Sequence, residues 1–256
     1  MSRTIFITGA TSGIGQACAE RFAASKDQLI ICGRREERLK KFREELEKKH
    51  GIAVLPLSLD VRDKEAVNQV IKKLPFHWKK IDVLVNNAGL ALGLSGIDDG
   101  DTDDWDQMID TNLKGLLYIS QAVIPLMKAQ GSGHIVNIGS VAGVETYPKG
   151  NVYCATKHAV ASLTKGMRID LLPFGIKVSQ VSPGAVETEF SIVRFHGDTE
   201  KAGNVYKGYQ PLTGEDVADA VHYVTGVPAH VNVNDLLLMP AAQASATIFH
   251  KEEIKE

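Results

Sequence analysis

Short apolar runs rich in β-branched residues alternate with amphipathic stretches along the chain. The first pattern predicts buried strands and the second predicts helices that cover them. Strands are expected at residues 4–8, 29–32, 54–59, 82–86, 134–139, 176–181 and 236–239. Helices are expected at residues 13–25, 35–49, 64–74, 105–128 (with a bend near Pro125), 151–172 and 215–225.

The predicted strands are apolar on both faces, as in Ile5-Phe6-Ile7 and Val83-Leu84-Val85. Such strands belong to a parallel sheet that helices cover on both sides. The sequence therefore predicts an α/β fold. It is a doubly wound (Rossmann), mostly parallel, seven-stranded sheet with helices on both faces and a ligand crevice at the carboxyl ends of the strands. No linker divides residues 1–256, so one domain is expected. Residues 187–210 fit a substrate lid or a plain surface loop equally well.

Composition narrows the class of protein without revealing its chemistry. Of the 256 residues, 44% are hydrophobic and 23% are charged, and the formal net charge is -2. This balance gives no basic surface for nucleic acid or an anionic membrane, and no apolar run approaches a membrane span. Three scattered cysteines and eight scattered histidines predict neither a disulfide framework nor a metal site. We expect a cytoplasmic protein with no metal, nucleic acid or membrane partner.

A glycine-rich turn closes the first predicted strand and opens the first helix. It consists of Thr8, Gly9, Ala10, Thr11, Ser12, Gly13, Ile14 and Gly15. Glycines let the backbone approach a pyrophosphate closely, and the free N–H groups of the helix then face the phosphates. Glycine spacing alone is a weak signal, but its place between strand and helix favours dinucleotide binding.

The end of the second predicted strand indicates which dinucleotide is bound. An NAD enzyme usually carries an acid there, whereas this chain carries Arg34 and Arg35. Arginines can fork onto a 2′-phosphate, and one such contact contributes about 1.5–3 kcal/mol. We therefore predict NADP as the cofactor. The alternative is that both arginines cap the sheet edge or pair with Glu36 and Glu37.

Four polar residues are candidates for the catalytic machinery. Tyr153 and Lys157 lie four apart on one predicted helix, so they share a face. A nearby ammonium and the helix N-terminus are expected to lower the tyrosine pKa from its usual value near 10. Ser140 ends a strand at the crevice, and Asn112 is a locally unfavourable asparagine within a helix. Each is weak alone, and only the combination indicates a site.

These motifs occur in one order along the whole chain and resemble those of the short-chain dehydrogenase/reductase family. Asn112, Ser140, Tyr153 and Lys157 resemble its catalytic tetrad, and residues 86–89 resemble its Asn-Asn-Ala-Gly motif. The resemblance implies that NADP contacts Gly9, Thr11, Ser12, Gly13, Ile14, Gly15, Arg34, Arg35, Asp60, Val61, Asn87, Ala88, Gly89, Tyr153, Lys157, Pro183, Gly184, Val186 and Thr188. It also implies that Tyr153 exchanges the substrate proton and Ser140 binds the reacting carbonyl. Lys157 would hold the nicotinamide ribose and lower the tyrosine pKa, and Asn112 would keep a water.

Residues 87–93, 184–191, 193–195 and 228–232 resemble one branch of that family, the NADP-dependent serine, L-allo-threonine and 3-hydroxy acid dehydrogenases. This resemblance implies oxidation of the β-hydroxyl of small hydroxy acids, the reverse reduction of semialdehydes, and a homotetramer. Arg194 is then a candidate for the substrate carboxylate, or else an arginine that ties the lid to the body. Glu145 is a candidate for a substrate ammonium, or else a surface acid, and Tyr147 could line the same pocket beside Ser140 and Tyr153.

Two other readings remain open. The chain could be a short-chain reductase of ketones, sugars or 3-oxoacyl thioesters. It could also be a nicotinamide-binding sensor, although such proteins often lose the tyrosine or lysine that this chain keeps.

Tyr153→Phe removes the hydroxyl that would exchange the proton, and we expect it to abolish turnover while NADP still binds. Turnover is followed by the absorbance of the reduced cofactor, and binding by titration of NADP. Substantial residual turnover in the variant would overturn the assignment.

Overall fold

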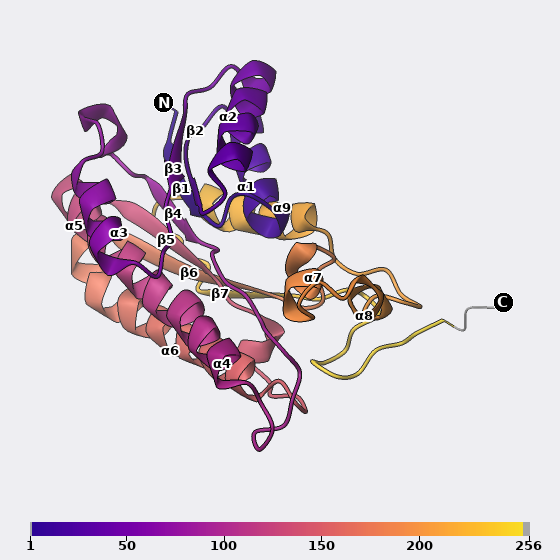
Figure 1. The fold of residues 1–256 in the computed structure, drawn as a ribbon. Coiled ribbons are helices and arrows are strands. Elements are labelled where there is room, and N and C mark those ends of the chain that lie inside the picture. The colour runs from indigo at the N-terminus through magenta and orange to yellow at the C-terminus, as the bar shows by residue number, and fades with distance from the viewer. Residues whose placement is uncertain (1, 253–256) are drawn as a thin grey trace.

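Seven parallel strands form one sheet through the centre of the molecule (Figure 1). The computed structural model describes residues 2–252, so residues 1 and 253–256 of the predicted domain lie outside the described part. The strands are β1 (Thr4–Thr8), β2 (Gln28–Gly33), β3 (Val54–Ser58), β4 (Val83–Asn86), β5 (Gly133–Ile138), β6 (Ile176–Pro183) and β7 (Asp235–Leu238). Their order across the sheet is β3-β2-β1-β4-β5-β6-β7. The prediction of a parallel, doubly wound sheet is confirmed.

Helices cover both faces of the sheet, with α1, α2 and α9 on one side and α3, α5 and α6 on the other (Figure 1). The helices are α1 (Gly13–Ala24), α2 (Glu36–His50), α3 (Lys64–Lys72), α4 (Thr102–Ile109), α5 (Leu116–Gln130), α6 (Asn151–Leu171), α7 (Glu189–Arg194), α8 (Thr199–Asn204) and α9 (Gly214–Gly226). Within residues 2–252, none of these helices is both long and apolar enough to cross a bilayer.

The first strand shows why the sheet needs helices on both sides. Ile5 and Ile7 point toward the layer of α1, α2 and α9, whereas Phe6 points toward α3, α5 and α6. Side chains alternate between faces along a strand, so an apolar strand gives each helical layer its own core. All three side chains are fully buried.

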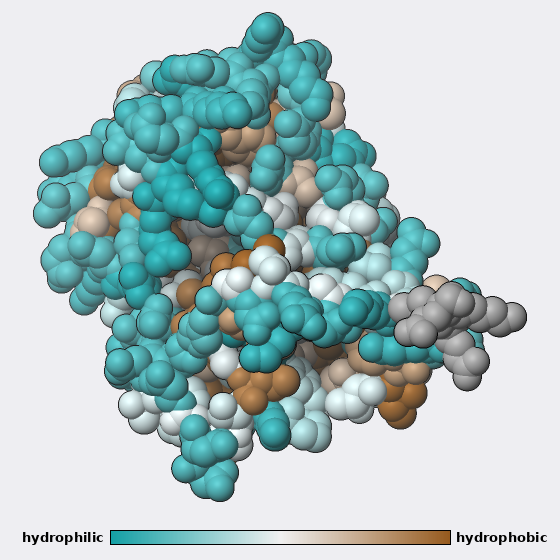
Figure 2. All heavy atoms as spheres, turned by 45° about the vertical axis from the view of Figure 1, so that its right-hand side comes forward, coloured by the Kyte–Doolittle hydropathy of each residue, from teal (hydrophilic) through white to brown (hydrophobic). Residues whose placement is uncertain are grey.

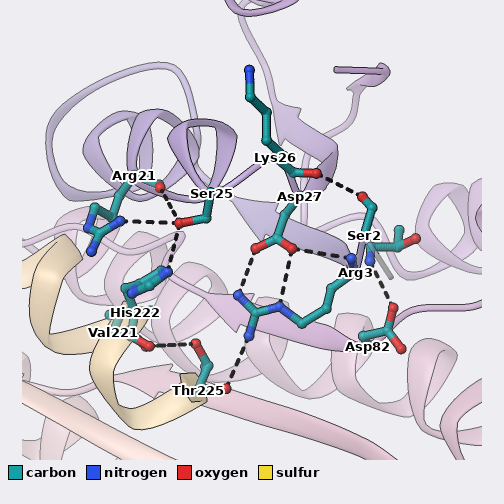
Figure 3. Close-up of polar contacts among 11 residues, drawn as sticks. Ser2, Arg3, Arg21, Ser25, Lys26, Asp27, Asp82, Val221, His222 and Thr225 are labelled. Carbon is teal, nitrogen blue, oxygen red and sulfur yellow. Dashed lines mark hydrogen bonds and ion pairs between the residues drawn. The ribbon is translucent and has the colours of Figure 1, made fainter. Parts of the chain in front are cut away.

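A polar cluster at the amino ends of β1 and β2 ties the sheet to the last long helix, α9 (Figure 3). The Arg3 guanidinium bonds both carboxylate oxygens of Asp27, at 3.2 and 2.6 Å, and reaches the carbonyl of Thr225 in α9 at 3.1 Å. Asp27 is buried, so this fork satisfies a charge that would otherwise be costly to desolvate. The cluster fixes the amino ends of the first strands and leaves the carboxyl ends for the site.

The long helix expected at residues 105–128 is confirmed in extent, but it is not a regular α-helix throughout. The structure has α4, then a wider π-helical turn over Asp110–Gly115, and then α5. The irregular turn therefore surrounds Asn112, whereas Pro125, where a bend was expected, lies within α5. Long-range contacts favour it. The Asn112 side chain is bonded to other segments, and a side chain at Gly115 would collide with Val61.

The segment expected at residues 187–210 as a lid or a plain loop contains two short helices, α7 and α8. Both lie beyond the carboxyl ends of the strands (Figure 1). Residues of α7 line the cleft described below, so this segment covers the crevice side of the sheet.

Candidate active site

A cleft of about 610 Å³ opens at the carboxyl edge of the sheet, beneath α7. It includes the point between β1 and β4 where the strand order reverses, the position at which open parallel sheets bind ligands. Figure 2 looks onto this side of the molecule and shows apolar side chains in the hollow with hydrophilic groups around it. The cleft therefore has an apolar body with a polar rim.

The glycine-rich turn is held by a side chain from the neighbouring strand. Gly9 has φ +66°, a conformation that glycine adopts without strain. A side chain at Gly15 would collide with the Gly9 carbonyl and the Asn87 amide, so the start of α1 lies directly against the turn. Asn87 donates to the carbonyls of Thr8 and Gly9 at 2.9 and 3.2 Å. This packing fixes the loop that faces the cleft.

Arg35 lies over that turn and uses all of its guanidinium nitrogens. It donates to the Thr11 hydroxyl at 2.9 Å, the Ser12 hydroxyl at 3.0 Å and the Glu189 carboxylate at 3.0 Å. The alternative pairing of Arg35 with Glu36 or Glu37 is not seen, because those acids pair with Lys40. Arg34 also lines the cleft. Two guanidinium groups thus flank the glycine turn at the end of β2.

Most of the residues singled out in the sequence meet in this one cleft. Three do not line it: Gly15 packs behind the turn, Asn112 lies beneath the floor, and Glu145 is exposed outside. Those that line it are Gly9, Thr11, Ser12, Gly13, Ile14, Arg34, Arg35, Asp60, Val61, Asn87, Ala88, Gly89, Ser140, Tyr147, Tyr153, Lys157, Pro183, Gly184, Val186, Thr188 and Arg194.

Tyr153 and Lys157 project from α6 to the deep end of the cleft, and both are buried. The Lys157 ammonium donates to the carbonyl of Ile138 at 2.9 Å and lies 5.9 Å from the centre of the Tyr153 ring. Burial lowers the pKa of Lys157 to about 8. The ammonium is therefore still charged at neutral pH, although it lies in a low-dielectric setting.

The pKa of Tyr153 moves opposite to the expected direction. Burial raises it above the ordinary value, and the neighbouring Tyr147 adds to this. The Ser140 side chain and the charge of Arg194 act in the other direction but do not overcome burial. From the sequence, Lys157 and the helix N-terminus were expected to set the pKa of Tyr153. Desolvation of the phenolate outweighs them, because apolar side chains surround Tyr153.

Asn112 binds together two parts of the site rather than facing the cleft. Its Oδ1 accepts from the Leu90 N–H at 2.9 Å, and its Nδ2 donates to the Leu90 carbonyl and to the Thr156 hydroxyl. Thr156 in turn donates to the Tyr153 carbonyl at 2.8 Å. Through these bonds, Asn112 in the π-helical turn fixes the position of Tyr153 in α6 relative to Leu90, in the segment after β4.

The candidate substrate side is formed by α7 and the loop after β5. Arg194 donates to the Tyr147 hydroxyl at 3.0 Å and to the Gly93 carbonyl at 3.3 Å. Its guanidinium carbon lies 5.8 Å from the centre of the Tyr153 ring. Glu145 instead accepts from the backbone N–H of Ala246 at 2.9 Å.

Three features at or beside the cleft were not singled out as site residues from the sequence. Phe190 of α7 packs edge-on against Tyr153 with ring centres 5.8 Å apart. Arg38, in the first turn of α2, donates to Glu189 at 3.0 Å and was missed because helix surfaces often carry arginine. The segment 243–249 forms part of the wall through Gln243 and Phe249. It has no periodic pattern, so only the tertiary structure reveals it.

Comparisons with known proteins agree with this geometry. A model of the short chain dehydrogenases matches residues 3–198. An NADP-dependent 3-hydroxy acid dehydrogenase of Salmonella typhi is 47% identical over 94% of this chain and 96% of its own. A sulfoacetaldehyde reductase of Chromohalobacter salexigens is 48% identical over 95% and 96%. The closed form of a serine dehydrogenase complexed with NADP+ has a TM-score of 0.91 and is 43% identical, covering 98% of this chain and 100% of its own.

Lys157→Met should remove a pH-dependent part of the stability. Between pH 8 and 10.5 the unfolded chain keeps a proton on Lys157 that the folded protein has released, so folded stability rises with pH in this window. Relative to Lys157→Met, the unfolding free energy of the wild type should increase by about 3 kcal/mol across it. Denaturant unfolding at several pH values measures this difference. Lys165→Met, an exposed lysine on the same helix, should keep the rise. Parallel curves for wild type and Lys157→Met would contradict the prediction.

Proposed function

We propose that this chain, which belongs to the short-chain dehydrogenase family, acts on small 3-hydroxy acids. It is an NADP-dependent oxidoreductase that acts on hydroxyl groups. The proposed reaction is oxidation of the β-hydroxyl of compounds such as L-serine, L-allo-threonine or 3-hydroxypropionate, and the reverse reduction of the semialdehydes. The supporting observation is an arginine without an acidic partner, placed beside Tyr153.

The residues around the cleft fit the groups of NADP in order. The glycine turn between β1 and α1 offers backbone N–H groups to the pyrophosphate, and Asn87 and Gly89 line the floor below it. Arg34, Arg35 and the hydroxyl of Ser12 would hold the 2′-phosphate. Asp60 and Val61 would contact the adenine, while Pro183 and Thr188 would border the nicotinamide.

The cofactor supplies the hydride chemistry, and the chain's own residues handle the proton. In the oxidative direction Tyr153 takes the hydroxyl proton of the substrate, and in the reductive direction it returns that proton to the carbonyl oxygen. Ser140 accepts a bond from the Ala142 N–H at 3.1 Å, which leaves its own hydrogen free to donate to the reacting oxygen. The charged Lys157 stabilises the phenolate that forms when Tyr153 gives up its proton.

The surroundings of Arg194 favour a substrate that carries a negative charge. Among residues 2–252 the Arg194 guanidinium group forms no ion pair, and two of its nitrogens bond the neutral oxygens of Tyr147 and Gly93. Since an unpaired cation in an apolar cleft is costly, an anionic ligand beside Tyr153 would stabilise it. The substrates in the relatives' names share this chemistry, because a 3-hydroxy acid carries a carboxylate and sulfoacetaldehyde carries a sulfonate.

Several expectations stay predictions. These are the homotetramer, the cytoplasmic location and the movement of residues 187–210 as a lid. Glu145 does not line the cleft and bonds the backbone of Ala246 in the cleft wall, so a role for Glu145 toward a substrate ammonium would need that contact to break.

A substrate panel tests the proposed function. NADP reduction is followed with L-serine, D-serine, L-allo-threonine and 3-hydroxypropionate, and NADPH oxidation with sulfoacetaldehyde, each with NAD or NADH as the cofactor control. We expect turnover of at least one 3-hydroxy acid, with NADP clearly preferred. Turnover confined to neutral alcohols and ketones would overturn the substrate class and favour the other reductases.

Arg194→Ala should separate anionic from neutral substrates. The loss of a charge-assisted contact is expected to lower kcat/KM for the hydroxy acid by about tenfold to a hundredfold. A neutral aldehyde such as propanal, measured with the same variant, serves as the control and should lose far less. An equal loss on both substrates would mean that Arg194 supports the lid and does not recognise a carboxylate.

A further inference from the structure

Glu189, the first residue of α7, bridges two arginines at the mouth of the cleft through its carboxylate. Glu189 accepts from Arg35 at 3.0 Å through Oε2 and from Arg38 at 3.0 Å through Oε1. Burial opposes ionisation, but the two guanidinium groups lower the pKa of Glu189 below its ordinary value. The carboxylate is therefore charged at neutral pH and ties α7 to the N-terminal turn of α2.

The same arginine is the one placed to meet a cofactor phosphate. Arg35 spans from Glu189 to the hydroxyls of Thr11 and Ser12 on the glycine turn. A phosphate that binds there would need the N–H groups that Glu189 and these hydroxyls now occupy. A carboxylate of the protein thus lies on the guanidinium group that the 2′-phosphate of NADP would use.

We propose that Glu189, which Arg38 also holds, competes with the 2′-phosphate of the cofactor for Arg35, and so limits the preference of the enzyme for NADP over NAD. The inference rests on the proposed cofactor site, in which Arg34 and Arg35 bind that phosphate. Glu189 is a specificity-determining residue here, because it acts on the affinity for one cofactor and leaves the other unchanged.

The charge of each anion and the exposure of the ion pairs determine whether the 2′-phosphate or Glu189 binds the arginine. The phosphate carries nearly two negative charges and presents three oxygens, whereas Glu189 carries one charge. The side chains of Arg35, Arg38 and Glu189 are 41%, 54% and 46% exposed, so their ion pairs are weak and yield to a stronger anion. Binding of NADP then loosens the tie to α7, whereas NAD, which lacks the phosphate, leaves it in place. The coupling is reciprocal, so removing Glu189 tightens NADP.

The other end of α7 has contacts of its own, which lets the variant keep its fold. The Gly93 N–H donates to the Arg194 carbonyl at 3.0 Å, and His196 lies 3.1 Å from the carboxylate of Asp104. These contacts hold the C-terminal end of α7 near α4 whether or not Glu189 is tied. The competition therefore concerns the adenosine side of the cleft and not the substrate side.

Glu189→Gln tests the competition, because it keeps the shape of the side chain and removes its charge. The dissociation constants of NADP, NAD, adenosine 2′,5′-bisphosphate and adenosine 5′-monophosphate are measured by calorimetry for the wild type and the variant. We expect NADP and the bisphosphate to bind about threefold to tenfold more tightly to the variant, with NAD and the monophosphate unchanged. The gain should shrink at high salt, since the groups are exposed.

Glu187→Gln is the matched control, an exposed acid two residues away that does not line the cleft. It should bind all four ligands as the wild type does. An unchanged or weaker affinity of Glu189→Gln for NADP, or an equal change for NADP and NAD, would overturn the competition. Failure of the cofactor proposal gives a different result, because the wild type itself would then bind NADP no better than NAD.

Discussion

All seven strands run in the same direction, and this constraint decides where the chemistry of the molecule lies. Every strand of a parallel sheet ends at the same edge, so the turns after β1, β2, β4, β5 and β6 meet in one place. The opposite edge is closed by the fork of Arg3 on Asp27, which ties the sheet to α9. The glycine turn, the arginines and the tyrosine are far apart in the sequence, and the topology alone brings them around one cleft.

Burial then sets the properties of the catalytic groups. Tyr153 and Lys157 are buried, and Met108 of α4 and Phe190 of α7 pack around the tyrosine, so the charged form of each group is disfavoured. The Lys157 ammonium keeps its charge near neutrality because a single carbonyl, that of Ile138, solvates it. For Tyr153, the Ser140 side chain and the charge of Arg194 favour the phenolate but do not overcome burial. The charge of Lys157, 5.9 Å from the centre of the tyrosine ring, is therefore placed where a phenolate would need it.

The repeating features of the fold could be predicted from the sequence, and the long-range ones could not. Strand positions follow from apolar runs, and Tyr153 and Lys157 could be paired because helix spacing is local. The π-helical turn at Asn112 was missed because its cause, bonding to Leu90 and Thr156, lies in distant segments. The engagement of Arg35 by Glu189 was equally invisible, since 154 residues separate the two. The direction of the Tyr153 pKa shift needed the buried surroundings that only packing creates.

The wall formed by residues 243–249 has a consequence for the order of biosynthesis. The Gln243 side chain accepts from the N–H of Ala185, next to the turn that ends β6, and Phe249 lines the cleft. The glycine turn is synthesised well before Phe249, so the cleft around it stays open on one side until Phe249 has emerged. A nascent chain can therefore form its seven strands before this part of the cleft wall is in place.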